Sequence, residues 1–362
     1  MPTILHTEAS RGLGGQELRI LAETRWLLDH GWDALVACQP TSPLLAEAEA
    51  AGIPAVAVRM RGVHDLPALV ALRRLMKTRA VSLVHTHSSV DSWLGALAAR
   101  WPRLPVVRSR HVSIRILSRR ALVYRLADRV VTSGEAVRAI VVGAGIPAER
   151  VVSIPPGVDT RRFHPGVSGK TVRDELGLGA DRPLIGLVAD IRGSKGHNVF
   201  LEAAREVLRR RPEARFLIVG DGVGRGEVRR RVADMGLDAA VTLTGFRRDI
   251  PEVMAALDVL VLPSIRSEAT SQVIPQAFAV GTPVVASTVG GSPELVRDGE
   301  TGHLVPPGDA RALAGAIVDI VNDPERAREL GRAGQRLVGE RYSMDASMAL
   351  TTSVYRGLLG SN

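Results

Sequence analysis

Short runs of β-branched and aliphatic residues alternate along the chain with longer stretches whose apolar positions recur at helical spacing. The helical stretches include Gln16–His30 and Leu66–Thr78 in the first half, and Val199–Arg210 and Glu227–Met235 in the second. The short runs, bounded by turn residues, predict two series of buried strands. The first series is Ala34–Ala37, Ala55–Val58, Val81–Val84, Val106–Val107, Val130–Thr132 and Val151–Ile154. The second is Leu184–Val188, Phe216–Val219, Val241–Thr244, Val259–Leu262, Val284–Ala286 and His303–Val305. Such alternation predicts parallel α/β sheets with helices on both faces.

A cluster of chain-breaking residues separates the two series. It comprises Pro155–Asp159 and Pro165–Gly169, which together are typical of a linker. The length of 362 residues also exceeds twice that of a common single domain. We therefore predict two α/β domains, residues 1–165 and 166–341, followed by a helical segment over 342–362. Ligands of open α/β sheets bind at the carboxyl ends of the strands, so we expect the site in a cleft between the domains.

Composition and charge narrow the classes of partner. Hydrophobic residues make up 45% and charged residues 23% of the chain, which excludes a disordered protein. The net charge is +9, and residues 1–165 carry all of this excess, with 22 Lys and Arg against 13 Asp and Glu. A basic first domain predicts a partner that is phosphate, nucleic acid or anionic lipid. Aromatic residues are only 3%, and no recognition motif is present, so nucleic acid is not expected.

The single cysteine and the chain start indicate the compartment. Cys38 has no partner for an intrachain disulfide, which fits a reducing cytosol. The first residues lack the basic and apolar pattern of a signal peptide, and no apolar run approaches the roughly 18 residues of a membrane span. We expect a cytoplasmic protein that would meet a membrane only from its inner surface.

Several common enzyme classes lack their motifs. The glycine-rich segment after Phe216–Val219 has Arg225 where a dinucleotide fingerprint requires its third glycine, and Gly12–Glu17 also breaks that spacing. Phosphate loops, zinc-protease motifs, serine-hydrolase elbows and Cys/His metal spacings do not occur. The sequence thus argues against a dehydrogenase, a P-loop NTPase, a zinc protease and a serine hydrolase.

A different set of segments, spread over nearly the whole chain, carries a resemblance. In the first half these are Gly14–Glu17, Leu83–His87, Thr132–Glu135 and Ile154–Asp159 with Phe163 and Pro165. In the second half they are Arg192–His197, Leu217–Gly222, Val261–Ser264, Glu268–Gln276, Gly281–Ser287 and Gly290–Gly291. In this order and spacing they resemble a family 4 glycosyltransferase of the GT-B fold. The resemblance implies two Rossmann-like domains, with a C-terminal helix that returns to the N-terminal domain.

The resemblance implies a donor site for a nucleotide sugar in the second domain. Arg192 and Lys195 would clamp the diphosphate, since cations and phosphates form strong hydrogen bonds. Many family members have an arginine five residues before the lysine, whereas this chain has Asp190 there. Glu268 would accept hydrogen bonds from sugar hydroxyls. The family's second glutamate, which grips the ribose, is replaced here by Gln276, which keeps a carbonyl acceptor without the charge.

Other residues complete the implied site. The catalytic set is Arg192, Lys195, Glu268 and His111. The donor-binding set is Gly14, Gly15, Gly220, Phe246, Arg247, Ser271, Gln272, Val273 and Gln276. Backbone N–H groups at a helix start would meet the phosphates, and the Gly14-Gly15 pair would permit close approach of donor or acceptor. Each feature has a plainer alternative: a solvated basic turn at Lys195, a first-turn acid at Glu268, and a hydrophobic plug at Phe246.

We therefore expect a retaining glycosyltransferase that needs no divalent metal and transfers a sugar to a glycan or glycolipid acceptor. His85 and His87 share one face of a strand and are assigned to packing or acceptor contacts, not to a metal. An anionic membrane surface is a further expected partner, on the strength of a run of arginines. These are Arg108, Arg110, Arg115, Arg119, Arg120, Arg125 and Arg129. The alternatives are a non-catalytic nucleotide-sugar-binding regulatory protein, suggested by Gln276 and Asp190, and a sugar-nucleotide epimerase.

Overall fold

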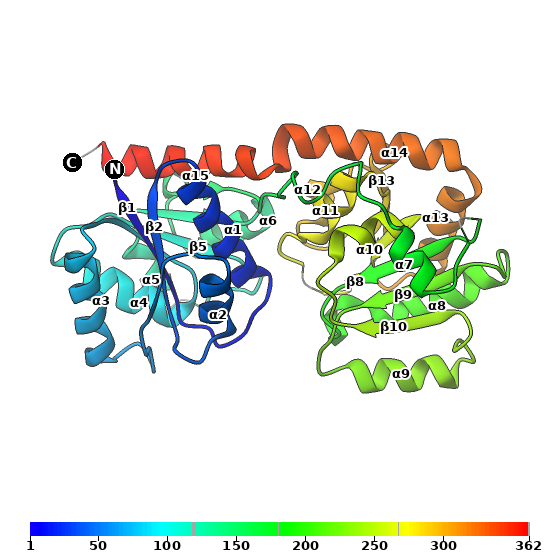
Figure 1. Cartoon of the computed structure of the whole chain (residues 1–362), viewed down its shortest axis with the longest axis horizontal. Helices are drawn as coiled ribbons and strands as arrows, with labels where there is room; N and C mark the ends of the chain where they lie inside the picture. Colours follow the sequence, from blue (N-terminus) through cyan, green and yellow to red (C-terminus); the bar gives the residue numbers. More distant parts are fainter. Residues whose placement is uncertain (118–120, 180, 267, 361–362) are drawn as a thin grey trace. The chain divides into compact units, whose positions relative to one another are not determined.

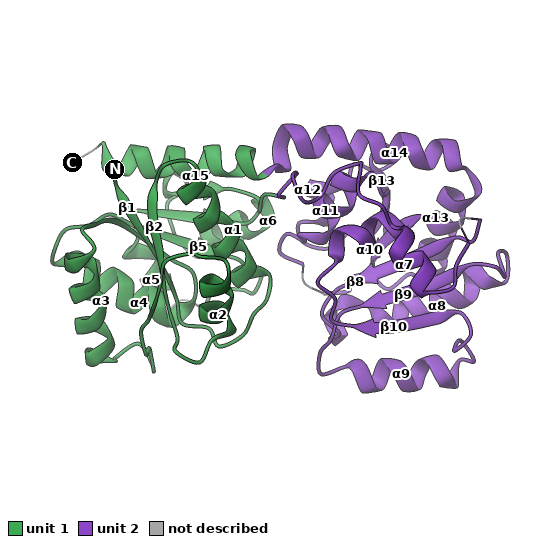
Figure 2. Cartoon of the chain, in the orientation of Figure 1, with its two compact units in different colours: residues 1–157, 344–362 green, residues 158–343 purple. Residues whose placement is uncertain are grey.

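The computed structural model describes residues 1–117, 121–179, 181–266 and 268–360. They form two compact units (Figure 2). Unit 1 comprises residues 1–157 with 344–362, and unit 2 comprises residues 158–343. The sequence placed the changes of domain after residues 165 and 341, whereas the structure places them after 157 and 343.

Unit 1 is built on a seven-stranded sheet of order β3-β2-β1-β4-β5-β6-β7. Strands β1, β2 and β5 of this sheet are labelled in Figure 1. Every neighbouring pair is parallel. The strands are β1 (Thr3–Glu8), β2 (Asp33–Cys38), β3 (Ala55–Ala57), β4 (Val81–Thr86), β5 (Val106–Arg110), β6 (Arg129–Thr132) and β7 (Val151–Ser153). The helices are α1 (Gly15–Asp29), α2 (Pro43–Ala50), α3 (Leu66–Thr78), α4 (Ser89–Arg100), α5 (Leu122–Arg125), α6 (Glu135–Gly143), η2 (Ala148–Arg150) and α15 (Met344–Leu359).

Unit 2 is built on a six-stranded parallel sheet of order β10-β9-β8-β11-β12-β13. The strands are β8 (Leu184–Val188), β9 (Arg215–Val219), β10 (Val241–Gly245), β11 (Val259–Leu262), β12 (Val284–Ser287) and β13 (Gly302–Val305). The helices are α7 (Lys170–Glu175), η3 (Gly193–Lys195), α8 (His197–Leu208), α9 (Arg225–Asp234), α10 (Ile250–Ala256), α11 (Val273–Val280), α12 (Ser292–Leu295), α13 (Ala310–Asn322), α14 (Pro324–Leu337) and η4 (Val338–Tyr342).

The last helix, α15, packs on unit 1. Met348 and Tyr355 are fully buried in a core cluster with Ile4 of β1 and Leu27 of α1. Trp26 of α1 also donates a hydrogen bond to Asp345, with 2.6 Å between Nε1 and Oδ1. This confirms the expected return of the C-terminal helix to the N-terminal domain. Across the described residues, no helix combines the length and the apolar character needed to cross a membrane.

Candidate active site

The strand order of unit 2 reverses between β8 and β11, and the chain leaves both strands at the same edge of the sheet. Open α/β sheets bind ligands at such a switch point. Lys195 ends the short helix η3 that follows β8, and Glu268 lies in the loop after β11. Their side chains meet, with 2.7 Å between Lys195 Nζ and Glu268 Oε2. Ser264 donates a second hydrogen bond to the same oxygen at 2.8 Å.

This ion pair is buried: only 9% of Lys195 and 6% of Glu268 is exposed. Burying two charges carries a desolvation cost, so stability alone does not explain why this pair is buried. The plainer interpretations of both residues are wrong, because Lys195 is not a solvated turn and Glu268 precedes α11 by five residues. The pair places an ammonium and a carboxylate side by side where a phosphorylated sugar would need both a cation and a hydroxyl acceptor.

Two glycines fix the loops that carry this pair. Gly196 has a φ of +74°, and a Cβ there would lie 1.8 Å from the carbonyl oxygen of Pro263. Gly290, with a φ of +56°, would place a Cβ 1.7 Å from the carbonyl oxygen of Glu268. The first contact joins the loops after β8 and β11, and the second joins the loops after β11 and β12. Only glycine allows backbones to approach this closely.

The remaining donor residues predicted in unit 2 are spread around the same edge. Gln272 is the N-cap of α11, Val273 is its first residue, and Gln276 lies half-buried one turn later. Ser271, just before the cap, is 7% exposed. The fold itself requires glycine at position 220, because a Cβ there would lie 2.0 Å from the carbonyl oxygen of Ala189.

Arg192 and Phe246 are exposed, whereas Arg247 forms hydrogen bonds with other side chains of the protein. Its guanidinium donates two hydrogen bonds of 2.8 Å to Glu175 and bonds of 2.9 and 2.6 Å to Asp249. The hydrogen bonds that Arg247 donates to these two carboxylates, Asp249 first, raise the pKa of Arg247 further above its usual range. Arg247 therefore ties α7 to the start of α10, and Phe246 is the exposed side chain of the predicted pair.

The strand order of unit 1 reverses between β1 and β4. Gly14 is the N-cap of α1 after β1, and a Cβ there would come no closer than 3.5 Å to a protein atom, Glu17 Oε2. The protein fold itself thus leaves room for a Cβ at Gly14. His111 directly follows β5, half-buried, and bonds to His87 with 3.2 Å between His111 Nε2 and His87 Nδ1.

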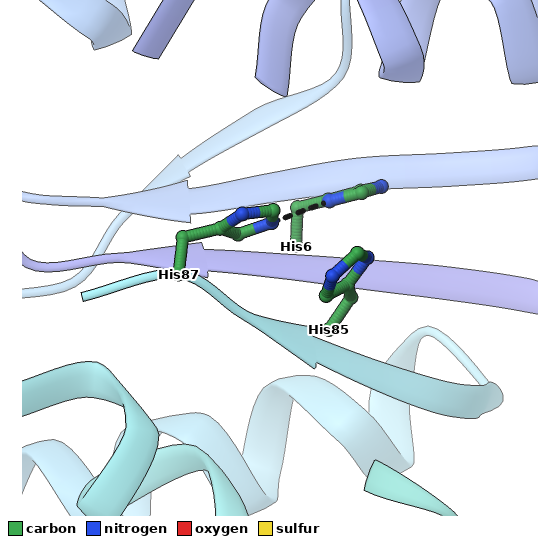
Figure 3. A group of neighbouring side chains, drawn as sticks. All are labelled: His6, His85 and His87. Atoms are coloured by element: carbon green, nitrogen blue, oxygen red, sulfur yellow. Dashed lines mark hydrogen bonds between the residues drawn. The ribbon is translucent and has the colours of Figure 1, made fainter. Parts of the chain in front are cut away.

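A buried histidine cluster lies behind this edge (Figure 3). His6 Nδ1 and His87 Nε2 are 2.9 Å apart. The two nitrogens of His85 bond to the hydroxyls of Tyr355, at 2.6 Å, and Ser109, at 2.8 Å. Burial lowers the pKa of His6 to about 4, and it lowers the pKa values of His85 and His87 well below the usual histidine value. All three rings are therefore neutral at pH 7.

The nitrogens of His6, His85 and His87 lie within 4.8 Å of one another, close enough to raise the possibility of a metal. Both ring nitrogens of His85 and of His87 already have hydrogen-bond partners. The guanidinium of Arg19 also opposes a positive charge on His85 and His87. Neutral, hydrogen-bonded imidazoles account for this cluster, and a cation would have to break those bonds beside another cation.

Two buried carboxyl groups hold the loops beside the histidines. Glu8, the last residue of β1, accepts hydrogen bonds from the backbone of Ser10, at 2.7 Å, and from the side chain of Gln16. Burial, together with the charge of Asp91, raises the pKa of Glu8 to about 8. Asp91 accepts hydrogen bonds from Thr7 and from the backbone of His87 and caps the start of α4. Neither acid was predicted from the sequence; the available signal was an acidic residue at or near the end of a strand, with Glu8 ending β1 and Asp91 in the first turn of α4.

The lowered pKa values predict that unit 1 loses stability in mild acid. As the pH falls through 6.5 the unfolded chain protonates its histidines, while the folded cluster stays neutral, so unfolding becomes easier between pH 6.5 and about 4. For His6 alone the shift corresponds to about 3 kcal/mol at about 1.4 kcal/mol per pKa unit. Glu8 acts in the opposite sense, because its raised pKa favours the folded form as the pH falls from about 8 to 4.5. Burial also raises the pKa of Asp91, which acts in the same sense, so two carboxyl groups oppose four histidines, His111 included.

Tryptophan fluorescence can measure this effect, because all four tryptophans belong to unit 1. They are Trp26, Trp32, Trp93 and Trp101. The urea midpoint followed by fluorescence should be lower at pH 5 than at pH 7. Replacing the exposed His164 of unit 2 with glutamine should leave this difference unchanged. A midpoint that stays constant or rises at pH 5 would contradict the prediction that the histidines outweigh Glu8 and Asp91 in this pH range.

Comparison with known proteins decides the family. A profile described as Glycosyltransferase Family 4 matches residues 13–162, and one described as Glycosyl transferases group 1 matches residues 182–323. A GDP-mannose-dependent alpha-(1-6)-phosphatidylinositol monomannoside mannosyltransferase of Mycolicibacterium smegmatis is 32% identical over 320 residues, 82% of this chain and 77% of that protein. The chain belongs to glycosyltransferase family 4. An Escherichia coli enzyme of this kind, a UDP-Gal:alpha-D-GlcNAc-diphosphoundecaprenol alpha-1,3-galactosyltransferase, is 27% identical and covers 88% of each chain.

Solved structures confirm the fold of this glycosyltransferase. Anabaena HepE in complex with UDP superposes with a TM-score of 0.88 at 24% identity, covering 99% of this chain and all of that one. A glycosyltransferase from Rickettsia africae gives a TM-score of 0.90 at 21% identity, with 100% and 99% covered. The predicted GT-B fold is therefore confirmed. The relatives are sugar-transferring enzymes, and nothing among them supports a regulatory binding protein.

Proposed function

We propose that this glycosyltransferase moves a sugar from a nucleoside diphosphate sugar to a hydroxyl group of a glycan or lipid-linked acceptor, with retention and without a required divalent metal. The buried pair of Lys195 and Glu268 at the switch point of unit 2 carries the proposal. The names of two relatives support it: one uses GDP-mannose and a phosphatidylinositol mannoside, and the other uses UDP-galactose and a diphosphoundecaprenol-linked sugar.

In this proposal the second unit stabilises the leaving group. The bond between the anomeric carbon and the diphosphate breaks, and its electron pair passes to the phosphate oxygen. Lys195, the exposed Arg192 and the N-terminus of α11 would meet the negative charge that develops there. Glu268 would accept hydrogen bonds from sugar hydroxyls, while Phe246 and Gln276 would contact the nucleoside.

The acceptor hydroxyl attacks the same face from which the diphosphate leaves, and its proton passes to the departing phosphate oxygen. The new glycosidic bond then has the configuration of the donor. Because cationic side chains and backbone N–H groups supply the positive charge, a divalent ion is not needed for the departure. His111 and Gly14 of unit 1 would lie against the transferred sugar or the acceptor.

A transfer assay tests this function. The protein is incubated with UDP-, GDP- or ADP-sugars and with a short lipid-linked or free glycan acceptor, in the presence of EDTA. We expect one product whose anomeric proton coupling matches the donor configuration, at a rate that EDTA does not reduce. An inverted product, or activity that returns only with added metal, would contradict the proposal, and an isomerised donor sugar formed without acceptor would indicate an epimerase.

We also propose that unit 1 meets the anionic inner surface of the cytoplasmic membrane through the segment that follows β5. Ile116 is buried and anchors this segment, while Val112, Ile114, Leu117 and Leu122 are exposed apolar side chains within eleven residues. Arg110 fixes its backbone by donating hydrogen bonds to Tyr124 and to the carbonyl of Ile114. Exposed apolar side chains this close together in the sequence are typical of an interaction surface.

The arginine run contributes less charge to this surface than the sequence suggested. Arg108 is buried, with its guanidinium 4.0 Å from the ring centre of Tyr124, so it adds nothing to the exposed surface. Arg119 and Arg120 lie outside the described residues. Arg115 and Arg125 are exposed. Arg115 lies among the apolar positions in the sequence and Arg125 follows them, and such a combination of arginine and aliphatic groups fits an anionic lipid surface.

Vesicle binding tests the surface with a matched control. Ile114→Asn/Leu117→Asn should weaken binding to phosphatidylglycerol-rich vesicles about 30-fold, because each of the two aliphatic side chains contributes on the order of 1 kcal/mol when partly inserted. Leu66→Asn/Val70→Asn, on α3 of the same unit, should bind like wild type. The two pairs are matched in exposure, at 66% and 60% against 69% and 64%. Equal binding by all variants, or binding unaffected by salt and lipid charge, would contradict this surface.

A further inference from the structure

Three histidines form a hydrogen-bonded row that leads from the core of unit 1 to the carboxyl ends of its strands. His6 lies in β1, His87 directly follows the neighbouring strand β4, and His111 directly follows β5. The nitrogen separations are 2.9 Å from His6 Nδ1 to His87 Nε2 and 3.2 Å from His87 Nδ1 to His111 Nε2. Figure 3 shows the first of these bonds, with the His85 ring beside it. Successive rings are nearly parallel, inclined by 21° and 18°.

The row constrains the positions of the protons. A neutral imidazole has one N–H and one bare nitrogen. His87 is bonded on both nitrogens, so it must donate to one neighbour and accept from the other. The row can therefore run in only two directions. If it runs toward His6, the Nε2 of His6 carries the proton; if it runs toward His111, that nitrogen is bare.

The inner end of the row distinguishes the two directions. His6 Nε2 is buried and has no hydrogen-bond partner among the described residues. The nearby carboxylate of Glu23 is paired with Arg19 through Oε1, which lies 2.5 Å from Nε. Its Oε2 is buried and has no hydrogen-bond partner among the described residues, so it does not accept a hydrogen bond from His6 Nε2. A buried N–H without a partner is rarer and costlier than a bare acceptor. The arrangement with bare Nε2 on His6 is thus favoured, and each ring then donates toward His111.

We infer that His6 and His87 are positioning residues that hold His111 in the tautomer with the proton on Nδ1, turned away from the row, so that His111 donates a hydrogen bond to a substrate oxygen. This inference rests on the proposed function, because the substrate is the nucleotide sugar or its acceptor. His111 then acts as a neutral donor, which selects a ligand with an acceptor oxygen at that point and excludes a charged imidazolium from the site. His87 never touches the substrate; it acts through His111.

Nitrogen NMR of the protein labelled with ¹⁵N-histidine tests the tautomer without any assay of transfer. The chain has nine histidines, so the His111 signals can be assigned by its loss in His111→Gln. We expect the long-range proton–nitrogen pattern of an Nδ1–H tautomer in wild type. The opposite tautomer, or an even mixture of both, would overturn the inference even if transfer is observed. If no transfer is found but the Nδ1–H pattern is present, the proposed function is wrong, while the inferred tautomer of His111 is confirmed.

Two conservative variants of His87 separate positioning from structure. An asparagine amide nitrogen reaches the place of Nδ1, so His87→Asn keeps the bond to His111; a glutamine amide reaches the place of Nε2, so His87→Gln keeps only the bond to His6. We expect His87→Asn to retain kcat within about threefold, and His87→Gln to lose about 10-fold in kcat and to show mixed His111 tautomers. Equal kcat in the two variants, with both folded by circular dichroism, would show that His87 has no positioning role.

Discussion

Replacing Lys195 with methionine is expected to slow sugar transfer at least about 100-fold, the loss found when one preorganised donor to a developing negative charge is removed. Methionine keeps much of the length and the apolar stem while removing the ammonium group. Glu268 would keep Ser264 as a partner but lose its counter-charge in a site where only 6% of it is exposed. Breaking a buried pair in this way typically costs about 3–5 kcal/mol of stability. The effect would be measured as kcat with saturating donor, together with the unfolding midpoint.

Two further variants separate loss of chemistry from loss of folding. Lys170→Met removes a lysine that pairs with Asp174 at a similar 2.6 Å but whose side chain is 78% exposed, so stability and kcat should hardly change. Lys195→Met/Glu268→Gln removes both charges and should recover much of the stability without recovering activity. If Lys195→Met folds normally and retains wild-type kcat, the assignment of Lys195 to the leaving group is wrong.

Replacing Gly290 with alanine is expected to inactivate the enzyme through the backbone of Glu268. The added Cβ would lie 1.7 Å from the carbonyl oxygen of Glu268 and 2.7 Å from its carbonyl carbon, so the loop that carries the carboxylate must move. Left-handed backbone at an alanine costs about 1–2 kcal/mol, and overpacking adds about 1–3 kcal/mol. We expect a loss of about 2–5 kcal/mol in stability and about 100-fold in kcat.

Gly299→Ala is the matched control for that change. Gly299 has a φ of +71° in the same unit, and nothing lies within 4 Å of the place a Cβ would occupy. Its alanine variant should therefore show only the backbone cost and keep its kcat. A Gly290→Ala protein that behaves like Gly299→Ala would show that contact with the Glu268 loop is not needed for activity.

Strands buried on both faces by aliphatic residues could be predicted closely from the sequence. The predicted bounds of β8 and β11 equal those of the structure, and helix α3 agrees as well. Strand β1 is the instructive exception, since no bounds were predicted for it. It is fully buried, yet three of its last four positions are buried His6, Thr7 and Glu8. Polar residues that serve a site remove the apolar signal that marks a strand.

The residues of the candidate site could be predicted as motifs but not as contacts. The resemblance indicated Lys195 and Glu268 separately; only the adjacency of β8 and β11, which are far apart in the sequence, brings them together. The same limit applies to Arg247. Its partners Glu175 and Asp249 could not be identified from the sequence, because the fold brings the end of α7 and the start of α10 to Arg247. Ser264 belongs to the segment Val261–Ser264 that carries the resemblance, but its hydrogen bond to Glu268 depends on the loop conformation.

Calorimetric titration of nucleoside diphosphate sugars tests the central claim most directly, because it asks whether a donor binds and whether Lys195 holds it. UDP-, GDP- and ADP-sugars would each be titrated into wild type, Lys195→Met/Glu268→Gln and the exposed-lysine control Lys170→Met. The account predicts saturable binding of at least one donor to wild type and to Lys170→Met, weakened at least about 10-fold by loss of the buried pair, since about 1.4 kcal/mol corresponds to tenfold. Equal donor affinity in all three proteins, or no binding of any sugar nucleotide to wild type, would contradict it.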